Sequence, residues 1–110
     1  MEGFMKGDVV VVLFPFSDLS STKRRPALVV ANLVGDDFIL CQITSKARQD
    51  QYTISLEKSD FKDGSLPVQS CIRPNRLFTA DKSIIDKKVG SLFPRKIKEV
   101  EKHIVQLVTG

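Results

Sequence analysis

Short runs of apolar residues, each about as long as a β-strand, recur through most of the chain. The run at 9–14 (VVVVLF) is unbroken, and its first four residues are β-branched, which is typical of a buried strand. The segment at 52–56 (YTISL) alternates and indicates a half-buried strand. The predicted strands are 9–14, 26–32, 38–43, 52–56, 68–73 and a short piece at 76–80. Five or six short strands about ten residues apart predict a small, strongly curved sheet or barrel.

The segments between these strands are mostly polar. Residues 16–23 (FSDLSSTK) and 44–51 (TSKARQDQ) are predicted to be loops, and 63–65 (DGS) is predicted to be a turn. Residues 57–62 suit one helical turn. The pattern at 82–92 does not decide between helix and strand, and a glycine interrupts it.

One helix is predicted near the end of the chain, over 94–108. Its first residue is a proline, which suits the first turn of a helix. Five apolar side chains fall on one narrow stripe when the helix is drawn at about 100° per residue. They are Ile97, Val100, Ile104, Leu107 and Val108. The stripe predicts that this helix packs against the β core.

Length and composition fit one globular domain spanning residues 1–110. Apolar residues make up 42% of the chain and charged residues 27%, which is ordinary for a folded protein. No stretch reaches the roughly 18 apolar residues that a membrane span needs, and the N-terminal residues do not resemble a signal peptide. The net charge of +4 permits an anionic partner such as nucleic acid without demanding one.

Cysteine and histidine are too few and too scattered for a common metal site. Cys41 and Cys71 stand in separate segments, and His103 is the one imidazole. We therefore expect free thiols, a cytoplasmic location and no metal or other cofactor. Glycine-rich phosphate loops and the common hydrolase motifs are also missing from the sequence. Any catalysis must rest on Arg, Lys, Ser, Thr, Asn or carboxylate side chains.

Three basic clusters fall in loops or at strand ends, at 23–26 (KRRP), 46–48 (KAR) and 73–76 (RPNR). The planar guanidinium of arginine offers paired N–H donors, which match the oxygens of a phosphate and the negative charge that develops on them during phosphoryl transfer. A phosphoryl-cleaving site also needs a hydroxyl, amide or carboxylate nearby. Such groups are Asp18 before the first cluster, Thr44 and Ser45 beside the second, and Ser70 beside the third. The alternative is that these charges only solvate loops.

The order of motifs resembles the MazF/PemK/Kid family of toxins from bacterial toxin–antitoxin pairs. The chain runs GDVVVV, then KRRPALVV, QITS, SCIRPNRLFTAD and an amphipathic helix, so the resemblance covers about 6–108. It implies a small SH3-like β-barrel with a C-terminal α-helix, mainly β in an α+β class, paired as a homodimer. It also implies a metal-independent endoribonuclease that cuts single-stranded RNA at short sequences and is blocked by a cognate antitoxin.

The resemblance assigns roles to individual residues. Arg25 matches the arginine of the R-P motif, whose implied role is to contact the scissile phosphate. Thr44 matches a threonine whose hydroxyl would bond the same phosphate. Arg73 falls where some Kid-like members carry a second functional arginine, but Asn75 replaces their acidic base, and an amide takes no proton at neutral pH. The pair of Arg25 and Thr44 is thus the predicted catalytic pair.

Further residues are predicted to bind the RNA substrate. They lie in the basic clusters and in the polar loops beside them: Ser17, Asp18, Arg24, Ser45, Lys46, Arg48, Ser70, Arg73, Asn75 and Arg76. Two other functions stay open at this stage. One is a barrel toxin that binds a protein target such as gyrase, or nucleic acid, without cutting it. The other is a structural or dimerisation module whose basic loops serve solvation only.

Overall fold

The computed structural model describes residues 3–15, 22–45 and 51–110. Within these ranges the chain forms seven strands, two short 3-10 helices and one α-helix. The strands are β1 (Asp8–Pro15), β2 (Thr22–Asn32), β3 (Asp37–Thr44), β4 (Ile54–Leu56), β5 (Phe61–Gly64), β6 (Ser70–Asp81) and β7 (Ile85–Leu92). The helices are η1 (Lys58–Asp60), η2 (Lys82–Ile84) and α1 (Pro94–Thr109).

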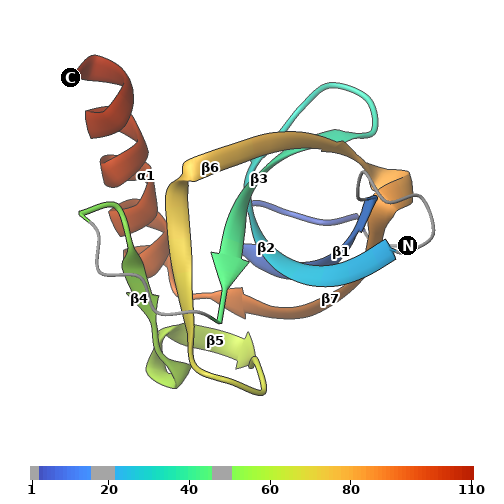
Figure 1. The fold of residues 1–110 in the computed structure, drawn as a ribbon, viewed down its shortest axis with the longest axis horizontal. Coiled ribbons are helices and arrows are strands. Elements are labelled where there is room, and N and C mark those ends of the chain that lie inside the picture. Colours follow the sequence, from blue (N-terminus) through green and yellow to red (C-terminus); the bar gives the residue numbers. More distant parts are fainter. Residues whose placement is uncertain (1–2, 16–21, 46–50) are drawn as a thin grey trace.

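The strands form one antiparallel sheet in the order β4-β6-β3-β2-β1-β7-β5. The sheet curls round on itself, and α1 stands beside β4 and β6 (Figure 1). The two edge strands, β4 and β5, are joined by η1. This architecture confirms the predicted class, a small, mainly β fold with a C-terminal helix.

Both faces of the central strands are buried, in two separate apolar clusters. Val9 of β1 lies beneath α1 in one cluster, with Leu28 and Ile43. The next residue along, Val10, lies in the other cluster on the opposite face, with Leu40. Successive side chains of a strand point to opposite faces, so a strand buried on both faces needs an unbroken apolar run. The sequence of β1 meets that requirement.

The helix α1 packs on the sheet through its first half. Val100 is fully buried, and Ile97 and Ile104 pack beside it against the cluster under the helix. The last two members of the predicted stripe are exposed, Leu107 by 39% and Val108 by 77%. The prediction that they pack against the core is wrong for this chain, because the α1 residues that join the cluster under the helix end at Ile104.

Several element boundaries differ from those predicted. Residues 61–64 form β5 where a helical turn and a loop turn were predicted, and 85–92 forms β7 despite its glycine. That glycine, Gly90, faces β5 so closely that a Cβ atom would stand 2.7 Å from the carbonyl oxygen of Asp63. Sequence periodicity alone does not reveal such a close approach of two backbones.

A bulge in β6 accounts for the apparent break at its proline. Cys41 of β3 pairs with Leu77, whereas the next residue, Gln42, pairs with Arg73. Residues 74–76 therefore lie outside the ladder while β6 continues on either side. The predicted strands at 68–73 and 76–80 are two halves of one strand. No helix among the described residues is both long and apolar enough to cross a membrane.

Candidate functional site

The candidate site lies where two neighbouring strands separate. The ladder between β2 and β3 ends at Ala27 opposite Gln42. Continuing the same register by two residues would set Arg25 opposite Thr44. Instead, β2 continues only along β1, with Arg25 opposite Val12. The two strands that carry the predicted catalytic pair therefore part just before that pair.

Pro26 helps to explain why the strands separate at this point. Proline has no N–H to donate, so it is tolerated in a sheet only where a neighbouring strand is absent or bulged. β1 pairs with β2 on both sides of Pro26, but β3 pairs with β2 only from Ala27 onward. The sequence placed this proline at the start of a strand. The structure places it where β2 becomes an edge toward β3.

A cleft of about 400 Å³ lies at this separation. Arg24 and Arg25 of β2 line it on one side, and Thr44 at the end of β3 lines it with Ser45. Ser70, the first residue of β6, also lines it. Five residues from the predicted site thus meet in one cleft, although they come from three distant parts of the sequence. The volume lies within the range of about 300–1,000 Å³ that is usual for ligand pockets.

Among the described residues, the charged side chains that line the cleft are cationic. They are Arg24, Arg25 and Lys87, the last from β7, where it stands opposite Val11. Arg24 also pairs with Asp86, its Nη1 lying 2.9 Å from the carboxylate oxygen. Half-buried Arg25 therefore lies beside a second guanidinium that already has a carboxylate partner. Such a lining favours an anion, and an arginine fork matches the oxygens of a phosphate.

The far wall of the cleft is formed by the 65–69 loop between β5 and β6. Leu66, Pro67 and Val68 all line the cleft. The hydroxyl of Ser70 donates a hydrogen bond to the carbonyl oxygen of Val68 at 3.0 Å, which fixes the end of this loop to β6. Ser70 is itself buried. Its role in the structure is thus to hold the wall as well as to line the cleft.

Three predicted substrate-binding residues do not line this cleft. Arg73 is only 6% exposed and lies in the β6 ladder, opposite Gln42. Asn75 is exposed on the bulge of β6, and Arg76 lines a separate hollow with Leu77. The bulge takes residues 74–76 out of the ladder with β3. The remaining four predicted residues, Ser17, Asp18, Lys46 and Arg48, lie outside the residues that the structure describes.

Lys87 and the apolar wall of the cleft were not predicted from the sequence. Lys87 lies in the segment whose secondary structure the pattern left undecided, so its strand and its neighbours could not be assigned. Leu66 and Val68 belong to a short loop with no catalytic residue type. Only the pairing of β7 with β1 and the course of the 65–69 loop bring these residues to the cleft.

The cysteines do not contribute a reactive thiol to the cleft. Burial raises the pKa of the Cys41 thiol to about 12 from an ordinary value of 9.0, and the thiol donates a hydrogen bond to the Arg73 carbonyl oxygen. The thiol thus stays protonated at neutral pH. Cys71 is half-buried and, like Cys41, is not bonded to another cysteine. Within the described ranges, no three His, Cys, Asp or Glu side chains gather as a metal site would require.

The family comparison agrees with the order of motifs. A family model described as the PemK-like, MazF-like toxin of type II toxin–antitoxin systems matches residues 5–108. The chain belongs to this family. Family membership confirms the resemblance noted in the sequence. No curated protein matches the chain.

Solved structures of similar fold include several of this family. MazF from Deinococcus radiodurans superimposes with a TM-score of 0.78 at 21% identity, over 100% of both chains. The MazE–MazF complex of the same organism gives 0.78 at 21% identity, over 94% of each chain. An endoribonuclease in complex with its cognate antitoxin, from a mycobacterial species, gives 0.75 at 16% identity, over 97% of this chain and 96% of that one. At these identities the structures establish a shared fold.

Proposed function

We propose that this toxin is an endoribonuclease that cuts single-stranded RNA in the cleft between β2 and β3. Arg25 and Thr44 act on the scissile phosphodiester. The observation that carries the proposal is that the β2–β3 ladder ends just before these two residues, so that both line one cationic cleft. The family and the endoribonucleases of similar fold support the same reaction class.

The chemistry follows from what the cleft offers. The 2′-oxygen of the RNA attacks the adjacent phosphorus and gives its proton to solvent water, while the bond from phosphorus to the 5′-oxygen breaks and that oxygen takes a proton from solvent water. The products are a 2′,3′-cyclic phosphate and a 5′-hydroxyl. Negative charge grows on the non-bridging oxygens, where the Arg25 guanidinium neutralises it and the Thr44 hydroxyl donates a hydrogen bond. The nucleophile belongs to the substrate, so the proposed step needs positioning and charge neutralisation without a metal.

The partners of the proposed enzyme follow from the same chemistry and from the solved structures of similar fold. The RNA is single-stranded, because its bases and 2′-hydroxyls must be open to the loops that border the cleft. Solved structures of similar fold include toxins bound to an antitoxin, which supports a cognate antitoxin as a partner here. We place the working enzyme in the cytoplasm as a homodimer.

Cleavage of long single-stranded transcripts in excess EDTA tests the proposal. We expect discrete fragments with 2′,3′-cyclic phosphate and 5′-hydroxyl ends, identified by mass spectrometry. A substrate with 2′-deoxyribose at the cleaved position should resist, because it lacks the nucleophile. Intact RNA across several transcripts would contradict the proposal. Capture of a topoisomerase subunit without any RNA cleavage would favour the non-catalytic toxin instead.

A further inference from the structure

The two edge strands of the sheet are connected through η1. β4 pairs with β6, and β5 pairs with β7, each through three residue pairs. The two strands stand at opposite ends of the sheet order, and η1 joins the end of β4 to the start of β5. Because both ladders are short, the position of η1 decides where these two edges of the curled sheet lie (Figure 1).

A buried ion pair links η1 to the first turn of α1. Asp60, the last residue of η1, is 8% exposed, and Lys96 of α1 is 7% exposed. The Lys96 ammonium lies 3.5 Å from a carboxylate oxygen of Asp60 and 2.9 Å from one of Glu99. Lysine and aspartate are rarely buried unless they are paired. The junction between η1 and α1 is therefore built on opposite charges that water reaches poorly.

Asp60 also shapes η1 itself. Its carboxylate accepts the backbone N–H of Glu57 at 2.7 Å, and its carbonyl oxygen accepts the N–H of Phe93 at 2.9 Å. Arg95 adds a second cation, since its Nη2 atom lies 3.7 Å from Asp60 Oδ1 and donates a hydrogen bond of 3.0 Å to the Ser59 carbonyl oxygen. Asp60 thus keeps η1 in shape and attaches it to the start of α1.

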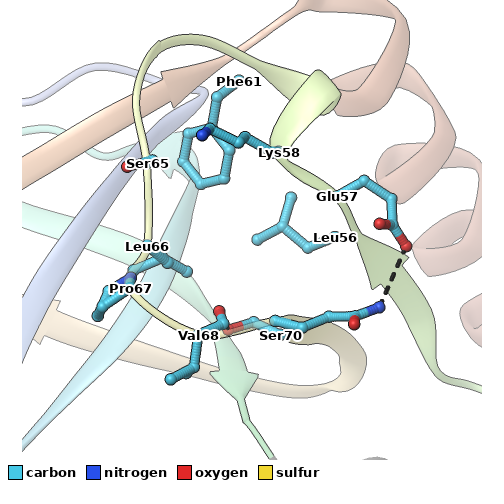
Figure 2. A pocket seen from close by; sticks show the side chains of 10 residues that line it. Leu56, Glu57, Lys58, Phe61, Ser65, Leu66, Pro67, Val68 and Ser70 are labelled. Atoms are coloured by element: carbon cyan, nitrogen blue, oxygen red, sulfur yellow. Dashed lines mark hydrogen bonds between the residues drawn. The ribbon is translucent and has the colours of Figure 1, made fainter.

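From η1 the contacts continue to the wall of the cleft. The Gln69 amide donates a hydrogen bond of 3.4 Å to the carboxylate of Glu57, the residue before η1 (Figure 2). A pocket of about 320 Å³, lined by Phe61 and Leu66 among others, lies between η1 and the 65–69 loop (Figure 2). The loop therefore does not pack tightly against η1 across this space. Its position depends on its two ends and on the bond to Glu57.

The position of this loop sets the width of the cleft. Leu66, Pro67 and Val68 line the cleft together with Arg25 and Thr44. Arg25 and Thr44 belong to β2 and β3 in the middle of the sheet order, whereas the loop follows the edge strand β5. A shift of η1 would thus move the wall and leave the two groups that act on the phosphate in place. RNA binding and the chemical step are therefore separable by experiment.

We propose that Asp60 and Lys96 are a positioning pair, which holds the 65–69 loop in place as the wall of the RNA cleft by linking η1 to α1. The proposal rests on the proposed function, since that function assigns the cleft to RNA. Neither residue lines the cleft. A buried ion pair adds little stability compared with apolar side chains of the same size. The contribution of the two charges is instead a defined geometry at the junction.

Steady-state cleavage of a defined RNA separates positioning from chemistry. Lys96→Met removes the ammonium and keeps a long unbranched side chain, and Lys98→Met is the matched control, because Lys98 is exposed on the same helix. In Lys96→Met, KM should rise at least about fivefold, the lower end of the range for coupled sites. The value of kcat should stay within about twofold, because the wall contacts the ground state and the transition state alike. Lys98→Met should change neither.

A double variant distinguishes positioning from stability. Asp60→Asn combined with Lys96→Met removes both charges, and the amide oxygen of asparagine can still accept the Glu57 N–H. Its Tm should lie above that of Lys96→Met, because no carboxylate is left buried without its lysine. KM should nevertheless stay raised, because the ionic link between η1 and α1 is still missing. A KM that returns to the wild-type value together with Tm would overturn the proposal.

Hydrogen exchange followed by mass spectrometry tests the link without RNA. Segment 54–64, which contains β4, η1 and β5, should exchange faster in Lys96→Met and in the double variant than in the wild type, while β1 and β2 keep their protection. If the wild-type protein cuts RNA but Lys96→Met changes neither KM nor this exchange, the positioning proposal is overturned while the nuclease stands. If the wild-type protein cuts no RNA, the proposed function fails together with the RNA role of the pair, whereas faster exchange would still establish the link.

Discussion

Replacing Gly64 with alanine should destabilise the protein more than any other glycine-to-alanine change at a turn. Gly64 ends β5 and precedes the 65–69 loop that walls the cleft, and its φ is +69°. An added Cβ would overlap the carbonyl oxygen of Val89 and stand 2.7 Å from the Cα of Gly90. Both obstacles are backbone atoms of β7, so relief requires β5 and β7 to move apart.

The magnitude follows from two contributions. A non-glycine residue in the left-handed region costs about 1–2 kcal/mol, and overpacking against a fixed backbone costs about 1–3 kcal/mol more. The sum is about 2–5 kcal/mol, which corresponds to a fall in Tm of about 8–20 °C for a domain of this size. Gly35 is the matched control, because its φ is +86° but a Cβ there would meet nothing within 4 Å. Gly35→Ala should cost only the first contribution, about 1–2 kcal/mol.

Thermal and urea unfolding followed by circular dichroism give both free energies. The expected outcome is a clear excess cost for Gly64→Ala, accompanied by weaker RNA cleavage because the 65–69 loop moves with β5. Equal costs for the two variants would mean that β5 does not lie against β7 as the structure shows. In that case, β5 would not hold the 65–69 loop in place as a wall of the cleft.

Three further outcomes are expected. Val100 is fully buried on α1, so Val100→Ala should lower the free energy of unfolding by about 2 kcal/mol. Val105 on the same helix is 56% exposed, so Val105→Ala should change that free energy by less than about 0.5 kcal/mol, and urea unfolding measures both. Lys87→Ala should reduce the slope of log affinity for RNA against log salt by about 0.7, as one lost phosphate contact does, while Lys98→Ala on α1 should leave that slope unchanged. Burial raises the folded-state pKa of Cys41 to about 12 from 9.0, so the stability that the protonated thiol contributes is complete below pH 9 and falls as pH rises toward 12. From about pH 9 to about pH 10.5, under reducing conditions, the free energy of unfolding of the wild type should fall by up to about 1.4 kcal/mol per pH unit more than that of Cys41→Ala.

Much of the fold could be predicted because its central strands are buried on both faces. The run at 9–14 and the stripe of α1 around Val100 are direct consequences of burial, and both elements formed where the sequence placed them. The prediction failed where contacts between distant segments decide the structure. Strand β5 has one half-buried residue and three exposed ones, so its pairing with β7 leaves little trace in the hydrophobic pattern. Leu107 and Val108 continue the apolar stripe but are exposed, because periodicity marks a face of a helix and does not tell how far along the helix the core extends.

The candidate site shows the same division. Arg25 and Thr44 were selected by residue type and motif, and the structure places both in one cleft. Arg73 was selected on the same grounds, but the bulge of β6 and the ladder with β3 leave it buried outside that cleft. The sequence could not reveal Lys87, because a lysine on a strand of undecided pattern looks like any solvated charge. The sequence named residue types that line the cleft, but it did not show which distant strands meet there.

A double-mutant cycle on the cleavage rate tests most directly whether Arg25 and Thr44 act on one phosphodiester. Arg25→Ala removes the guanidinium, and Thr44→Val removes the hydroxyl while keeping the shape of the side chain. With folding verified for each variant, kcat/KM on a defined RNA should fall about 100-fold or more for each single change. The double variant should lose much less than the product of the two, because both groups stabilise the same charge. Full activity in either single variant, or losses that multiply as if the residues were independent, would contradict the account.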